Sequence, residues 1–587
     1  TETTAMGDNI GDALEMYGVG VLAKSGAITL TGATGTSSSS NVYGCSLDHS
    51  TASSLANSSA SFGARAATTI DGVDMSTSSS DITFNCDSLV SGTTTQVHTA
   101  LTTGKVTIQP ADGAQSFDRA VSNYGFDLGS NVTAFTFGQS GTGGTVSGAT
   151  QNAQDLTVAG AASIAGPISI FGATVNANSN IVTTSGAITL KATDNVVIGA
   201  GTNATTRRTI QTSGGSIYLW SNADAAGTGA VAVGNFVTLS SGGGNISLAG
   251  GTTAAEAAPT GFAVANATYP SGVRLATSSV ADNLSINSAG GNILIQGSSA
   301  QNVTNGLGVI QWAGSTINSG TGSIKIDGRS TASSSTFNRH GIELGFDGTA
   351  STLITSAKTS ADAIEINGQT SGTSTDGKGL NFWSGAAATY VKVAATGSGG
   401  NIKLTGSAST STMPGVSVNW ARILSSSGTV TIDSGTNPTT FGASSTSSAV
   451  HIGADTVGGA TGDVHLNASG FTFAGTANFR TTGSLSFDSG TAQSFASAQT
   501  FAAANVTVNQ IKDFRIGTAG TGSAQNTASV TLSAPVIATG AIAIYGGDVT
   551  VNANLSTSTA SELLLKGTGD VTVGAGTSGA RRALNTG

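Results

Sequence analysis

The feature that most constrains this chain is a repeat of very long period. GPISIFGATVNAN at residues 166–178 returns as GAIAIYGGDVTVNAN at residues 540–554. GAITLTG at residues 26–32 likewise returns as GNIKLTG at residues 400–406. Both pairs share an offset of roughly 375 residues, which indicates one duplication of a large unit. A chain built in this way favours a stacked, repetitive architecture over a single globular core.

The repeat divides the chain into four segments. Residues 1–16 are predicted to form a leader or linker, and residues 17–212 a partial copy of the unit. Residues 213–390 complete the unit, and residues 391–587 begin the next copy. Because the copies start and stop inside the unit, we expect the chain to be an excerpt from a longer tandem array.

A short motif recurs inside the long unit and predicts the fold class. Glycine and a small polar residue precede an aliphatic–x–aliphatic run, as in GGNISLAGG (243–251), GGNILIQGS (290–298) and TGSIKIDG (321–328). Strict alternation of this kind is typical of a strand with one buried face, and no segment shows the 3.6-residue period of a helix. Separate β-sandwiches would require linkers, which the sequence lacks. Short strands with small turn residues and uneven spacing instead predict an all-β parallel solenoid with irregular loop insertions.

Composition narrows the classes of partner. The 22 Lys and Arg against 31 Asp and Glu give a formal net charge of -9, and only 9% of residues are charged. Nucleic-acid binding requires a basic stripe, and attachment to anionic membranes requires a polybasic patch, so we expect neither. No apolar run reaches the roughly 18 residues of a membrane-spanning helix, so this segment is not expected to insert into a membrane.

The same motifs carry a resemblance to a known family. GPISIFG near residue 166, TGDVTV near residue 568 and GGNIKLTG near residue 399 resemble the secreted filamentous-haemagglutinin-like proteins of bacteria. The likeness is greatest to giant repeat-rich cell-surface proteins. It implies a right-handed parallel β-helix, export to the bacterial cell surface, and a role in adhesion, aggregation or filament formation. The implied partners are copies of the chain itself, end to end or as neighbouring repeats, or the surface of a host or another cell.

Two cysteines, Cys45 and Cys86, leave two interpretations open. They form one disulfide, which suits an oxidising compartment, or they are two free buried thiols that act as small hydrophobes. In the second copy of the unit their counterparts are about Asn419 and Ala468, so the fold does not depend on them.

A set of charged side chains at outward positions is the candidate for surface chemistry. The set is Lys325, Asp327, Arg329, Glu343, Glu365, Lys392 and Lys403. If these strands stack in register, the side chains line one groove, and paired carboxylates there suit acid–base cleavage of a polysaccharide. The competing interpretation is a solvated ladder in which opposite charges alternate.

Aromatic side chains are the second surface candidate. Trp220 and Trp383 are the candidates for contact with carbohydrate, although a lone Trp on small-residue strands more often packs at a coil corner. No His or Cys cluster has the spacing of a zinc site, and no cofactor is expected.

These observations favour one function over another. The leading expectation is a non-enzymatic extracellular structural or adhesive segment of a giant bacterial surface protein, which forms a stiff rod or filament for attachment or cell–cell contact. The alternative is a polysaccharide-binding or polysaccharide-cleaving β-helix protein, in which Asp327 and Glu365 would act as the catalytic pair.

Overall fold

The computed structural model describes most of the chain. The described residues are 14–16, 19–32, 44–47, 59–66, 68–90, 98–111, 116–140, 151–225, 227–251, 258–333, 339–360, 362–372, 376–384, 389–442, 449–490, 493–509, 511–519, 525–558, 560–576 and 581–587. Residues 1–13 of the predicted leader lie outside them. Within the described residues every regular element is a β-strand and no helix is present. The chain divides into two compact units, residues 1–264 and 265–587, which are described one at a time.

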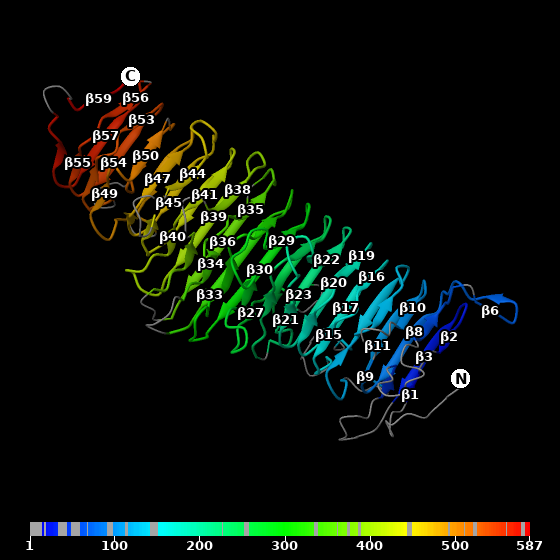
Figure 1. Cartoon of the computed structure of the whole chain (residues 1–587). Helices are drawn as coiled ribbons and strands as arrows, with labels where there is room; N and C mark the ends of the chain where they lie inside the picture. Colours follow the sequence, from blue (N-terminus) through cyan, green and yellow to red (C-terminus); the bar gives the residue numbers. More distant parts are fainter. Residues whose placement is uncertain are drawn as a thin grey trace. The chain divides into compact units, whose positions relative to one another are not determined.

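The first unit is a stack of parallel strands that follow one another in chain order (Figure 1). Its long sheet consists of β3 (Ala27–Gly32), β8 (Asp81–Cys86), β11 (Lys105–Gln109), β14 (Ala134–Phe137), β17 (Ile168–Gly172), β20 (Ile188–Ala192), β23 (Ile217–Ser221) and β26 (Ile246–Gly250). Its second sheet consists of β12 (Val121–Ser122), β15 (Leu156–Val158), β18 (Val175–Ala177), β21 (Val196–Ile198) and β24 (Val231–Val233). Its third sheet consists of β16 (Ala162–Ile164), β19 (Ile181–Thr183), β22 (Arg208–Thr212) and β25 (Val237–Ser240).

Shorter strands complete the first unit. Two small parallel sheets consist of β1 (Leu14–Glu15), β4 (Cys45–Ser46) and β9 (Leu89–Val90), and of β2 (Gly20–Leu22), β5 (Ser61–Gly63), β10 (His98–Leu101) and β13 (Phe126–Leu128). The remaining strands are the antiparallel pair β6 (Thr69–Ile70) and β7 (Val73–Asp74), and β27 (Ala263–Val264).

The second unit repeats this plan. Its long sheet consists of β30 (Ile293–Ser299), β33 (Ile324–Ser330), β36 (Ile364–Thr370), β39 (Ile402–Ser407), β42 (Val430–Asp433), β45 (Val464–Asn467), β48 (Leu485–Asp488), β51 (Phe514–Ile516), β54 (Ile542–Gly546) and β57 (Leu563–Gly567). Its second sheet consists of β28 (Val273–Leu275), β31 (Val309–Trp312), β34 (Ile342–Phe346), β37 (Leu380–Phe382), β40 (Val416–Val418), β43 (Thr439–Phe441) and β46 (Phe471–Phe473). Its third sheet consists of β29 (Leu284–Asn287), β32 (Thr316–Asn318), β35 (Thr352–Ser356), β38 (Val391–Ala395), β41 (Ala421–Ser425), β44 (Ala449–Gly453), β47 (Thr476–Arg480) and β50 (Val506–Asn509).

Two small parallel sheets end the second unit. They consist of β49 (Gln499–Phe501), β52 (Val530–Leu532), β55 (Val549–Val551) and β58 (Val571–Val573), and of β53 (Val536–Ala538), β56 (Leu555–Thr557) and β59 (Leu584–Asn585). Each coil therefore takes one strand from each of three faces. The predicted all-β parallel solenoid is confirmed.

Aliphatic side chains at inward positions form the core of each unit. Ile324, Ile364, Ile402 and Val430 lie in one register column and are each at most 1% exposed. Each side chain buried in this way stabilises the stack by about 1.5–3 kcal/mol. The intervals between these four positions are 40, 38 and 28 residues, so the column stays in register while the loops absorb the difference.

A buried amide turn follows β14 in the first unit. The Gln151 side-chain amide donates to the carbonyls of Gly172 and Lys191, each at 2.9 Å, and so reaches the next two strands of the long sheet. The Asn152 amide donates to the Phe171 carbonyl at 3.1 Å. Both side chains are at most 2% exposed, so these hydrogen bonds are made away from water.

The second unit contains the same turn in the stretch that the sequence predicts to be a copy. The Gln525 amide donates to the carbonyls of Gly546 at 3.3 Å and Lys566 at 3.1 Å. The Asn526 amide donates to the Tyr545 carbonyl at 2.7 Å. Sequence analysis did not single out this Gln–Asn pair, although it returns at the same offset as the quoted repeats.

Core positions in the two stretches can be compared directly. Ile168 and Ile542 are both fully buried. Ile198 is 1% exposed, whereas Val573 is 44% exposed, because β58 is the outermost strand of its sheet. The difference follows from the place of the strand in its sheet.

Candidate functional site

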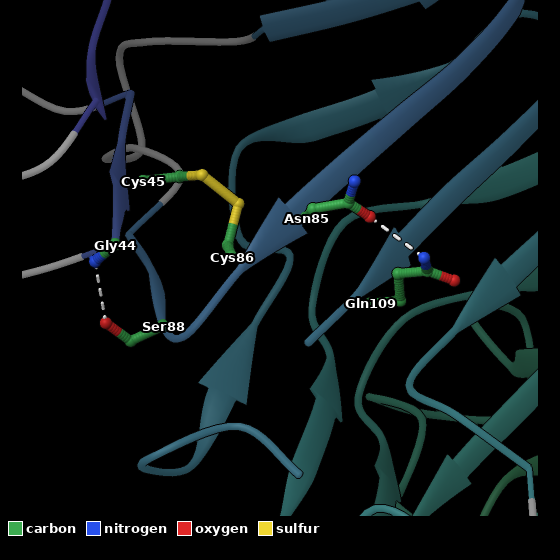
Figure 2. The surroundings of a disulfide bond; sticks show 6 residues. All are labelled: Gly44, Cys45, Asn85, Cys86, Ser88 and Gln109. Carbon is green, nitrogen blue, oxygen red and sulfur yellow. Dashed lines mark hydrogen bonds between the residues drawn. A yellow bond between two sulfur atoms is a disulfide. The ribbon is translucent and has the colours of Figure 1, made fainter. Parts of the chain in front are cut away.

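The two cysteines are joined by a disulfide in the first unit. Cys45 begins β4 and Cys86 ends β8, and both are fully buried (Figure 2). Beside the bond, the Gly44 amide donates to the Ser88 hydroxyl at 3.0 Å. The bond therefore ties the segment that holds β4 to the long sheet. Of the two interpretations left open by the sequence, the structure contains the disulfide, which persists in an oxidising compartment.

An alternating ladder of charges lies on the outer face of the long sheet in the second unit. We use this name for Lys325 on β33, Glu365 on β36 and Lys403 on β39, which are register neighbours, together with Asp327. The Lys325 ammonium lies 3.8 Å from Glu365 Oε2 and 3.6 Å from Asp327 Oδ2. Positive and negative charges thus follow one another from coil to coil, which is the stabilising arrangement for neighbouring strands.

Every carboxylate oxygen of this ladder has a partner. Asn367 donates to Asp327 Oδ1 at 2.8 Å and to Glu365 Oε1 at 2.9 Å. Gln296 donates to Asp327 Oδ2 at 3.1 Å, and Lys325 faces Glu365 Oε2. An open hollow of about 390 Å³ lies at one side of the ladder and is lined in part by Lys325, Asp327 and Arg329. Lys325, Asp327 and Glu365 thus lie together on one face, and the two carboxylates are engaged with protein groups.

Glu343 does not lie on this face, which corrects the sequence-based expectation. It lies on β34 in the second sheet and is 2% exposed. Asn381, its register partner on β37, donates to Glu343 Oε1 at 2.9 Å, and Oε2 has no hydrogen-bond partner among the described residues. Burial raises the pKa of the Glu343 carboxyl to about 7, against the opposing effects of Lys378 and Asn381. Glu343 is a buried acid and cannot contact a surface ligand.

The segments around His340 and Lys378 form the surroundings of Glu343. The Lys378 main-chain amide donates to His340 Nδ1 at 3.2 Å, and the Lys378 ammonium pairs with Asp376 at 3.2 Å. His340 is fully buried, and burial followed by the charge of Lys378 holds its pKa well below the usual range. Glu343 thus occupies an outward position of β34 that strand alternation alone would leave in water, and it lies near enough to Lys378 for that charge to act on its pKa.

The tryptophan candidates are placed differently. Trp220 on β23 is 2% exposed and donates from Nε1 to the Gly251 carbonyl at 2.6 Å. The Lys191 ammonium lies 4.6 Å from its ring centroid. Trp220 is a packing residue and is unavailable to stack on a sugar. Trp383 follows β37 and is partly exposed, with its main-chain amide bonded to the Leu344 carbonyl at 2.9 Å.

A second charged surface, which sequence analysis missed, lies on the third sheet of the same coils. Lys392 on β38, Arg422 on β41 and His451 on β44 are register neighbours, and we call them the basic row. Lys392 was expected in the same groove as Lys325, but it lies on a different sheet. Asp455 is the only carboxylate within 4.0 Å of the basic row among the described residues. It lies 3.8 Å from Lys392, 3.4 Å from Arg422 and 3.7 Å from His451.

Two further side chains complete the surroundings of the basic row. Arg480 on β47 donates to the main-chain carbonyl of Asp455, and its Nη1 lies 3.2 Å from His451 Nδ1. The Arg422 guanidinium lies over the Tyr390 ring, 4.0 Å from its centroid. Burial, with the charges of Arg480 and Arg422, lowers the pKa of His451, while Asp455 acts in the opposite direction.

Comparison with known proteins finds no match among family profiles, curated proteins or solved structures. Within the described residues, no group of three or more His, Cys, Asp or Glu side chains is placed to hold a metal ion. The same part of the chain contains no helix long and apolar enough to cross a membrane.

Proposed function

We propose that this chain is a non-enzymatic, extracellular structural and adhesive segment of a large bacterial surface protein. The observation that carries the proposal is the coil-on-coil parallel stack, in which strands of three faces remain in register while the loops vary. Such a scaffold displays the same outward position many times along its axis. Weak contacts repeated in this way add through avidity.

Two further observations support this proposal. The Cys45–Cys86 disulfide suits an oxidising, extracellular location. The resemblance to filamentous-haemagglutinin-like proteins suggests that neighbouring copies of the chain, or the surface of another cell, are the partners. The alternating ladder is consistent with a surface that binds rather than cleaves, because Asp327 and Glu365 are engaged with Asn367 and Lys325.

Attachment and catalysis can be separated in one experiment. Beads coated with residues 1–587 are expected to adhere to bacterial or host cells, whereas beads coated with albumin are not. The soluble chain is expected to release no reducing ends from polysaccharides. Release of reducing ends that is lost in an Asp327→Asn, Glu365→Gln double variant would replace this proposal with the polysaccharide-cleaving alternative. Absence of adhesion to every cell type tested would contradict the adhesive role.

A further inference from the structure

The basic row differs from an ordinary structural ion pair in the same unit. Arg515 grips Asp488 through two hydrogen bonds of 3.1 Å and 2.7 Å, the bidentate geometry of a closed pair. Arg422 lies 3.4 Å from Asp455 and donates no hydrogen bond to any described residue. Among the described residues its planar set of donors is therefore engaged only through the ion pair with Asp455, and the side chain is held in place over the Tyr390 ring.

The charges around Arg422 do not balance. Lys392 and Arg422 lie within 4.0 Å of the Asp455 carboxylate, and a third cation, Arg480, donates to the Asp455 main-chain carbonyl. Among the described residues this cluster therefore holds two more positive charges than negative ones while His451 is neutral. Like charges directly opposite on neighbouring strands destabilise a sheet. Such an excess is notable in a chain of net charge -9, and an external anion would relieve it.

The cations are also accessible. The side chains of Lys392 and Arg422 are 30% and 36% exposed. They lie on adjacent strands, about 4.8 Å apart in the direction of the stack. The same outward column continues through His451 to Asn478 and Thr507, so a short charged stretch is followed by neutral hydrogen-bonding groups.

We propose that the outer face of β38, β41, β44 and β47 binds the carboxylate or sulfate groups of an acidic polysaccharide. Arg422 holds one oxyanion through paired N–H donors, and Lys392 contacts the next negative charge along the polymer. Arg480 on β47 adds to the positive electrostatic potential of this face. Asn478 and Thr507 contact hydroxyl groups of the sugar. A nucleic acid is a poorer fit, because the row is short and lies in an acidic chain, whereas a duplex requires a long basic stripe. The inference rests on the proposed function only in that the polysaccharide is then the ligand of an adhesive segment.

His451 makes the binding dependent on pH. The groups that face His451 are Arg422 on β41, Arg480 on β47 and Asp455 after β44. Because Arg480 is always a donor, His451 Nδ1 accepts its hydrogen bond and the ring is neutral at pH 7. A bound anion favours the protonated ring, so binding raises the pKa of His451 and strengthens as the pH falls.

The test measures binding by the purified 1–587 chain in solution. Titration calorimetry at low salt compares polygalacturonate, which carries carboxylates, with dextran sulfate, which carries sulfates. Neutral dextran and duplex DNA are the reference ligands. We expect one acidic polysaccharide to bind at least about tenfold more tightly than either reference, and the better of the two identifies the oxyanion.

Matched variants locate the site. A Lys392→Gln, Arg422→Gln variant is expected to lose about tenfold or more in affinity, since charge-assisted hydrogen bonds are removed. A Lys325→Gln, Lys403→Gln variant removes the same charge from the alternating ladder and is expected to bind as the parent does. Asp455→Asn removes the competing carboxylate and is expected to bind more tightly. It keeps the test decisive if the first variant fails to fold.

Several results would overturn the proposal. These are equal affinities of the two double variants, unchanged or weaker binding in Asp455→Asn, binding of DNA or neutral dextran as tight as that of the acidic polysaccharides, or a His451 pKa that does not rise on saturation in an NMR titration. Failure of the adhesion assay together with intact polysaccharide binding would refute the adhesive function and leave this site standing. Adhesion without polysaccharide binding would do the reverse.

Discussion

The alternating ladder and the basic row occupy two faces of the same coils, and they differ in the order of charge signs along the column. In the ladder, Lys325, Glu365 and Lys403 follow one another with alternating sign. In the basic row, Lys392 and Arg422 follow one another with the same sign, and both pair with the one carboxylate of Asp455. The charges of the ladder are neutralised by their neighbours, whereas the basic row keeps an excess of positive charge that an anionic ligand would neutralise.

The difference teaches that the order of charges along a column matters more than their number. In-register stacking places every outward side chain beside its counterpart on the next coil. A substitution that changes one sign in a column therefore converts one kind of surface into the other. The following predictions test this rule, starting with the largest effect.

The largest expected effect concerns Glu343, whose carboxyl is perturbed mainly by burial, whereas the charges of the ladder and the row are affected mainly by neighbouring charges. Its pKa is raised to about 7, so its ionised form opposes folding, and stability is lost as the pH rises from the ordinary glutamate value through 7. Glu343→Gln is expected to stabilise the second unit by about 3 kcal/mol at pH 8 and to have little effect at pH 5.

Hydrogen exchange of β34 and β37 at the two pH values measures this effect. The buried side-chain oxygen of Asn381 has no hydrogen-bond partner in the part of the chain that the structure describes, and the new amide can donate to it. Glu365→Gln on the exposed ladder is the matched control and should show no comparable dependence on pH. Equal stabilisation at pH 5 and pH 8 would show that shape, and not charge, limits this site.

The second prediction compares the same substitution in the two surfaces. Asp455→Asn removes the one carboxylate that lies within 4.0 Å of Lys392 and Arg422 among the described residues, and it is expected to destabilise the second unit by about 1–2 kcal/mol. Asp327→Asn keeps an acceptor oxygen for Asn367, and its new NH2 can donate to Gln296 once that amide turns over, so the substitution is expected to cost less than about 1 kcal/mol. Urea unfolding of the two variants decides the order, and equal losses would break the comparison.

The third prediction converts the ladder into a second basic row. Glu365→Lys places three lysines in one column and is expected to cost about 1 kcal/mol through repulsion between neighbouring strands. It is also expected to create a new binding site for dextran sulfate. Glu365→Gln removes the attraction without adding repulsion, so its cost should be smaller. If Glu365→Lys gains no affinity, the sign order of a column is not sufficient to make a site.

The smallest predicted effect concerns His451. Burial and two arginines lower its pKa in the folded chain, so the unfolded chain takes up a proton first on acidification. The histidine therefore contributes a loss of stability as the pH falls below about 6.5. Hydrogen exchange of β44 and β47 measures this contribution as the difference in the pH dependence of stability between the parent and His451→Gln. High salt should reduce it, because the arginine charges are partly exposed.

Much of the fold could be predicted from local pattern. The Gly–polar–aliphatic–x–aliphatic motif at residues 399–406 matches β39 (Ile402–Ser407), because alternation and turn chemistry are local properties. The same alternation predicted the outward face of Lys325 and Glu365 correctly. The disulfide between Cys45 and Cys86 could not be decided in this way, since it depends on how closely two coils approach.

Two cases, Glu343 and the pair Lys392 and Arg422, show where local pattern fails. Glu343 has an outward position on β34 but is buried, and strand alternation does not predict which outward positions other parts of the chain cover. Lys392 and Arg422 are separated by 30 residues in the chain and become neighbours only through the length of one coil. The interval between successive aliphatic motifs gives the length of a coil, and this length would have predicted that Lys392 and Arg422 are neighbours.

The buried amide turn has a consequence for how such a chain changes over generations. Gln151 and Gln525 each donate to a carbonyl 21 residues ahead on one strand, and to a second carbonyl 40 or 41 residues ahead on the next strand. Both hydrogen bonds therefore depend on the spacing of the two following coils. A genetic exchange between copies that preserves those intervals leaves both hydrogen bonds intact. One that alters the strand spacing of either coil leaves a buried amide without its acceptor, at a cost of about 1–3 kcal/mol. The buried amide turn therefore penalises changes in strand spacing. We expect such genes to gain or lose sequence most readily in whole units, because these changes keep the spacing.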